Sequence, residues 1–139
     1  MENRLNLFLV HRYPIYELLF QSVLKDYYTV HFCQSEQEFF EFSHGKEAHV
    51  IIVDYFYPSI GKRNVEAFFF HLLRFFPDSF RNVVIPEALE KDLGWGDDIV
   101  RILSPFSIKE VSQVLMRYHD VWQETYGPCS VDAPVSLSV

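Results

Sequence analysis

The feature that most constrains the fold is a repeated alternation of short apolar runs with amphipathic segments of helical period. Five runs are too short for helices and rich in β-branched or aromatic residues, as buried strands are; they span residues 5–10, 28–33, 49–54, 82–86 and 99–103. Right-handed crossovers between such strands place helices on both faces of one sheet. The sequence therefore predicts an α/β fold with a doubly wound, five-stranded parallel sheet.

The segments between these runs predict the helices. The first helix is expected over about residues 14–25, because Pro14 suits a first turn and because an apolar stripe follows at helical spacing, made of Ile15, Leu18, Leu19, Ser22 and Val23. Ser35 and Ser107 each precede a glutamate by three residues, which is the capping-box pattern of a helix start. Both positions are therefore expected to begin helices.

The later segments are less regular. Asn64 is expected to cap a helix that is apolar almost all round and stops at Pro77. Gly94 and Gly96 leave about two helical turns after the fourth strand, so the fourth helix is predicted to be short or irregular. Residues 1–126 are expected to form one domain, whose last helix is ended by Gly127 and Pro128. Residues 127–139 are expected to be a C-terminal tail or a linker to which an output domain could be attached.

Composition narrows the functional classes. The chain has 139 residues, of which 49% are hydrophobic, enough for one domain with a large core. A net charge of −7 without a Lys/Arg run argues against nucleic-acid binding by this domain. No apolar stretch is long enough for a membrane span or a signal peptide, and Cys33 and Cys129 do not suggest a disulfide framework. We therefore expect a soluble cytoplasmic protein, with Cys33 as a small buried apolar residue.

In an open parallel sheet, ligands bind beyond the carboxyl ends of the strands. The residues at these ends are His11 and Arg12, Asp54, Ile85 and Pro86, and Ser104. Over residues 5–124 the sequence resembles the receiver domain of response regulators in two-component signalling. The resemblance is carried by Asp54 with Pro58 four residues on, and by the segment SPFSIKE at 104–110.

The resemblance implies a phosphoacceptor at Asp54, but several partner positions depart from the family pattern. The acidic pair that holds Mg²⁺ in the family aligns with His11 and Arg12, and the Ser/Thr that contacts the phosphoryl group aligns with Ile85. Ser104 stands at the lysine position, whereas Pro105 and Phe106 are retained. Arg101 stands where the family usually has an aromatic switch residue.

These replacements predict a pocket without metal or cofactor. Exchanging two carboxylates for His11 and Arg12 takes the local formal charge, with Asp54 included, from about −3 to about 0, whereas Mg²⁺ is normally held by carboxylates. At an effective dielectric near 20, each unit charge about 4 Å away is worth roughly 4 kcal/mol. We interpret Asp54 as an inactive phosphoacceptor and hypothesise that Arg12 pairs with it.

Other chemical signals are weak. His44 and His49 flank a Gly-containing loop without a further ligand at metal-binding spacing, and no Gly-rich phosphate loop or catalytic Cys/His pair is present. We therefore do not expect an enzyme. The aromatic residues at 68–76 are assigned to the core, with a partner surface on their outer side as the alternative.

Three functions stay open. The first is a pseudo-receiver, a phosphorylation-independent protein-interaction or dimerisation module in bacterial signal transduction or transcriptional regulation. By resemblance, its interaction face would comprise the fourth helix, fifth strand and fifth helix at 87–122, with Arg101, Ile108, Val111, Gln113 and Arg117. The second is a functional receiver phosphorylated on Asp54 by a histidine kinase. The third, a small α/β enzyme or flavin-binding protein, is disfavoured because no loop forms a phosphate cradle.

Overall fold

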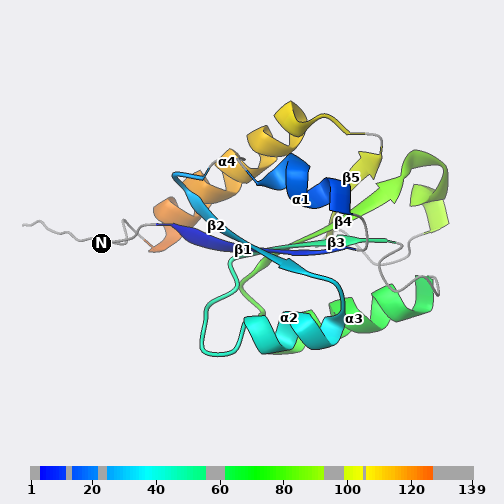
Figure 1. The fold of residues 1–139 in the computed structure, drawn as a ribbon, viewed down its shortest axis with the longest axis horizontal. Helices are drawn as coiled ribbons and strands as arrows, with labels where there is room; N and C mark the ends of the chain where they lie inside the picture. Colours follow the sequence, from blue (N-terminus) through cyan, green and yellow to red (C-terminus); the bar gives the residue numbers. More distant parts are fainter. Residues whose placement is uncertain are drawn as a thin grey trace, which may run out of the picture.

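A five-stranded parallel sheet in the order β2-β1-β3-β4-β5 forms the centre of the molecule (Figure 1). The computed structural model describes residues 4–11, 14–21, 25–55, 62–92, 99–104 and 106–126. The strands are β1 Leu5–Val10, β2 Tyr28–Cys33, β3 Val50–Asp54, β4 Phe80–Pro86 and β5 Ile99–Ser104. The predicted doubly wound sheet is confirmed. The predicted tail at 127–139 lies outside the described residues.

Helices cover both faces of the sheet. Helices α1 (Pro14–Phe20) and α4 (Ile108–Tyr126) lie on one face, and α2 (Glu36–Phe42) and α3 (Lys62–Phe75) lie on the other (Figure 1). After β4 the chain forms only a short 3-10 helix, η1 (Glu87–Asp92), as expected for the irregular fourth helix, so that α4 is the predicted fifth helix. None of the helices described is long and apolar enough to cross a membrane.

The core has two halves because side chains alternate across each strand. In β1, Phe8 and Val10 pack in one half, and Leu7 and Leu9 pack in the other, with all four fully buried. A strand buried on both faces gains from an apolar residue at almost every position. This explains why the strands are near-continuous apolar runs in the sequence.

Both predicted capping boxes are present. At the start of α2 the hydroxyl of Ser35 accepts a hydrogen bond from the Glu38 amide at 3.1 Å, and the Glu38 carboxylate accepts one from the Gln34 amide at 2.8 Å. At the start of α4 the Ser107 hydroxyl and the Glu110 carboxylate each accept a bond of 3.1 Å from the other residue's amide. These bonds satisfy amides that have no partner within the helix.

Two predictions for the helices were wrong. Helix α1 ends at Phe20, which is fully buried, whereas Leu18 of the predicted stripe is 68% exposed and Ile15 and Leu19 are also exposed. The other two residues of the predicted stripe, Ser22 and Val23, lie outside the described residues. Helix α3 begins at Lys62, so Asn64 lies within its first turn and is not its cap.

Candidate functional site

The carboxyl ends of β1 and β3 lie side by side at the centre of the sheet. Val10 is opposite Val53, so the next residues, His11 and Asp54, stand at the same level on neighbouring strands. Strand alternation places both on the face covered by α1 and α4, because Leu9 and Ile52 pack in that half of the core. The structure thus brings together two residues of the predicted pocket.

Asp54 is the last residue of β3 and is 2% exposed. The ladder continues past it, since the Tyr55 amide donates to the carbonyl of Val84 at 2.9 Å. The side chain that matches the family's phosphoacceptor is therefore buried at the end of a well-paired strand.

His11 is fully buried, and its amide donates to the Cys33 carbonyl at 2.9 Å. The imidazole lies against the rings of Tyr16 and Phe32, with centroids 5.8 and 5.9 Å away. Its Nε2 is 3.3 Å from a carboxylate oxygen of Glu17, although neither ring nitrogen makes a hydrogen bond of good geometry to the residues that the structure describes. Where the family has an acid, this chain has an aromatic-lined imidazole.

Glu17 was not predicted as part of the site. It lies in the first turn of α1 and reaches His11 because that helix packs over the end of β1. An acidic residue seven positions after the end of a strand carries no recognisable sequence signal. Its carboxylate adds a negative charge that the sequence-based count omitted.

The remaining pocket positions are spread over the sheet. Ile85 is fully buried in the core half that faces α2 and α3, and Ser104 ends β5 opposite Pro86. Ser104 is separated from Asp54 by β4, the strand between β3 and β5. Arg12, Pro58 and Pro105 lie outside the described residues, and so does the hypothesised Arg12–Asp54 pair.

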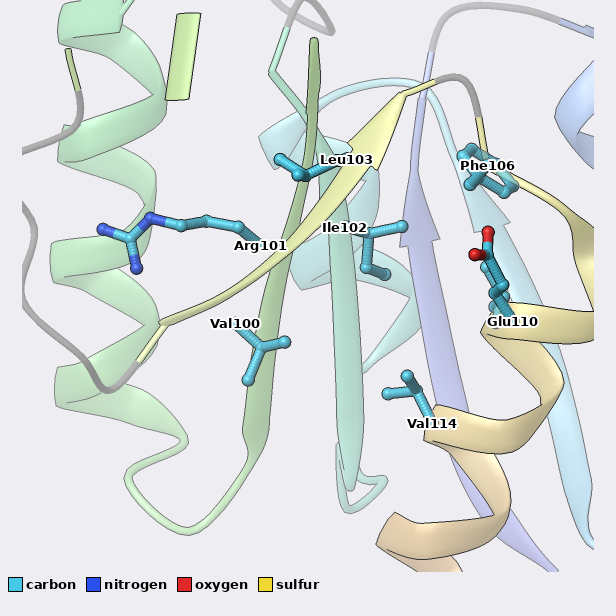
Figure 2. Close-up of a pocket in the computed structure, with 8 residues that line it drawn as sticks. Val100, Arg101, Ile102, Leu103, Phe106, Glu110 and Val114 are labelled. Carbon is cyan, nitrogen blue, oxygen red and sulfur yellow. The ribbon is translucent and has the colours of Figure 1, made fainter. Parts of the chain in front are cut away.

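A groove of about 330 Å³ lies beside β5 and α4, within the predicted interaction face (Figure 2). Its lining consists of Val100, Arg101, Ile102, Leu103, Phe106, Glu110, Val111 and Val114. Gln113 and Arg117 of the predicted face are exposed, and Ile108 and Arg101 are partly buried. The prediction that Val111 belongs to the interaction face was wrong. Val111 is 1% exposed and packs in the core, because it lies on the side of α4 that faces the sheet.

The histidine and cysteine side chains that the structure describes were compared with the requirements of a metal site and of a reactive thiol. Across the described part of the chain, no group of three His, Cys, Asp or Glu side chains is placed to hold a metal ion. His49 instead accepts a hydrogen bond from the Asn6 amide at 2.8 Å, while His44 is exposed. Cys33 is fully buried as predicted, and burial, with a smaller effect of Glu38, raises the pKa of its thiol to about 12. Such a thiol is unreactive near neutral pH.

Comparisons with known proteins identify the fold. No family model matches the chain, and no curated protein matches it. A response regulator from Thermotoga maritima superposes with a TM-score of 0.70 at 22% identity, covering 84% of this chain and 98% of its own. The signal receiver domain of an HD domain-containing protein from Pseudomonas fluorescens Pf-5 gives a TM-score of 0.69 at 17% identity, covering 91% and 94%.

A third structure belongs to a family of streptococcal redox sensors described as evolved from two-component response regulators. It has a TM-score of 0.72 at 15% identity, and the match covers 96% of this chain and 59% of the sensor. All three superpose on this chain with TM-scores of 0.69 to 0.72 over 84% or more of its length. This chain therefore has the fold of a response-regulator receiver domain.

Proposed function

We propose that this chain is a pseudo-receiver: a receiver-fold module of bacterial signal transduction or transcriptional regulation that acts through protein contacts, without phosphorylation of Asp54 and without enzymatic activity. The observation that carries the proposal is the fully buried His11 at the level of Asp54 on the neighbouring strand. A receiver uses an acidic residue at that position, and its metal-dependent chemistry depends on it.

Magnesium affinity should be low at this site. Mg²⁺ favours oxygen ligands in octahedral geometry, and the imidazole of His11 offers nitrogen in an aromatic surrounding formed by Tyr16 and Phe32. Each carboxylate lost about 4 Å from the ion removes roughly 4 kcal/mol of attraction at an effective dielectric near 20. The Glu17 carboxylate restores part of this charge, but it lies beside the His11 ring.

The groups that would stabilise a transferring phosphoryl group are also altered. Phosphoryl transfer depends on neutralising charge on the equatorial oxygens by metal, cations and hydrogen-bond donors. Ile85 is a buried core residue without a hydroxyl, and Ser104 brings no positive charge to the lysine position. These replacements support a role in which Asp54 is a structural carboxylate.

Such a module would signal by binding another protein at its surface. The face formed by β5 and α4 combines a groove with exposed residues such as Gln113 and Arg117. We propose that this face binds a protein partner or a second copy of the chain.

Amide NMR with a phosphoryl mimic tests the inert site. Addition of Mg²⁺ and beryllofluoride to the labelled protein should leave the resonances around Asp54, His11 and Ser104 unshifted, because the ion cannot be held. The variant Asp54→Asn serves as the matched control for non-specific effects. Shifts centred on Asp54 that disappear in this variant would show a functional receiver and reject the proposal.

A further inference from the structure

We infer that the groove between β5 and α4 binds an extended peptide segment, which adds a sixth strand to the open edge of β5. The inference rests on the proposed function, because it specifies the partner of the same interaction face. It follows from the backbone of β5, the shape of the groove and the charges at its rim.

The outer edge of β5 is open for pairing. The strand pairs with β4 from Ile99 to Ser104, and within the described ranges no strand lies on its other side. An edge strand presents unpaired N–H and C=O groups, which proteins commonly protect with charged residues or proline. In β5, Val100 and Leu103 are instead 41% and 38% exposed. Arg101 stands between them, but its side chain extends away from α4 and its Nη1 donates to the Ile99 carbonyl at 3.0 Å, so the part of the strand beside the groove is apolar.

The groove has the shape that an added strand requires. Figure 2 shows Ile102 and Val100 on the strand across from Val114 on the helix, with Phe106 near the carboxyl end. A strand paired with β5 would lie about 4.8 Å from it and would direct every second side chain toward α4, into the groove. This is the geometry by which extended peptides bind between an edge strand and a helix.

The charges at the rim favour a peptide with acidic residues over a second copy of the chain. Arg117 is exposed one turn after Val114 on the same flank of α4, and Arg101 extends from β5 on the side away from α4 (Figure 2). The Glu110 carboxylate accepts a bond from the Ser107 amide and so serves the helix cap. Two copies that each carry a net charge of −7 repel one another strongly. A short peptide carries far less charge, and an acidic residue in it can pair with the exposed Arg117 at the rim of the groove.

Selection from a phage-displayed library of random peptides, each about 10 residues long, provides the test. We expect selected sequences in which apolar residues alternate with polar and acidic ones. The variant Val114→Arg, which fills the groove, should weaken binding of the synthetic peptides more than about tenfold. The matched control Val121→Arg introduces the same charge at an exposed valine of α4 outside the groove lining and should leave binding within about twofold.

Methylation of single peptide nitrogens tests the pairing. In an added strand only every second N–H faces β5, so methylation should weaken binding at alternate positions. Uniform tolerance of methylation would overturn the inference, and so would equal binding to Val114→Arg. Self-association of the chain that Val114→Arg abolishes would assign the groove to a second copy instead. A failed selection with an unshifted Asp54 in the beryllofluoride experiment would reject the peptide site and leave the proposed function standing.

Discussion

At the scale of single residues, His49 shows how burial makes a side chain sensitive to pH. Its Nδ1 accepts a hydrogen bond of 2.8 Å from the Asn6 amide, and its Nε2 lies 3.3 Å from a carboxylate oxygen of Glu47. Its ring packs edge-on against Trp122. Burial lowers the pKa of His49, although the Glu47 carboxylate opposes this shift. Protonation would set a donor against the Asn6 amide, which is already a donor.

The free energy of unfolding should fall as the pH decreases below about 6.5, the pKa of an unfolded histidine. A group whose folded-state pKa is depressed stabilises the fold fully above its unfolded pKa and loses that contribution as the pH falls through its folded value. The variant His49→Asn keeps an acceptor but cannot titrate, so its stability should depend less steeply on pH. Urea unfolding at several pH values measures the slope.

The exposed His44 supplies the control, since His44→Asn should keep the slope of the parent protein. His31, whose pKa burial also lowers, should leave a residual slope in His49→Asn. Equal slopes for the parent and His49→Asn would contradict the assignment.

At the scale of elements, α1 shows what the pattern of apolar residues can and cannot predict. Two apolar stripes share this helix: Tyr16 with Phe20, and Ile15 with Leu18 and Leu19. Periodicity identifies residues that share a face but not the face that packs on the sheet, and the structure buries Phe20. Strands β1 and β3 were predictable because both of their faces are buried, and β2 and β5 because they are rich in β-branched or aromatic residues.

Substitutions on the two stripes should differ sharply in cost. Phe20→Ala should destabilise the protein by about 3–5 kcal/mol, because it leaves a cavity in the core. Leu18→Ala removes a side chain exposed to solvent and should change stability by less than about 0.5 kcal/mol. Chemical unfolding of both variants compares them. Similar losses for the two would show that Leu18 is covered in solution.

The same limit applies to the site. Asp54 could be placed from the sequence because it ends a run of β-branched residues. The contact of Glu17 with His11 could not, because it depends on how α1 packs against β1. Val111 was included in the interaction face by resemblance to the family, which does not show how α4 is rotated about its own axis. Successive residues of a helix are about 100° apart, so residues two positions apart lie on nearly opposite faces, and Val111 lies on the buried one.

At the scale of the whole molecule, the strand order divides the sheet into a centre and two edges. Strands β1 and β3 each pair on both sides, whereas β2 and β5 each pair on one side only among the strands described. Every residue of β3 is buried, while β2 and β5 include exposed ones. Opening of an edge requires less surface to be exposed than opening of the centre.

Hydrogen exchange should follow this division. Amides of β1 and β3 should exchange most slowly, at rates set by global unfolding, and amides of β2 and β5 should exchange faster through local opening. Native-state exchange read by mass spectrometry resolves the strands. Protection of β5 equal to that of β1 would contradict the prediction and show that its outer edge is covered.

The buried position of Cys33 makes its thiol a probe for opening of the sheet at strand β2. Its sulfur is sealed between the edge strand β2 and the core, next to Phe39 and Val10 in the same cluster. An alkylating reagent can therefore modify this sulfur only in molecules where that margin of the sheet has come apart. In the variant Cys129→Ser, in which Cys33 is the single cysteine, the rate of alkylation measures how often strand β2 separates from the core.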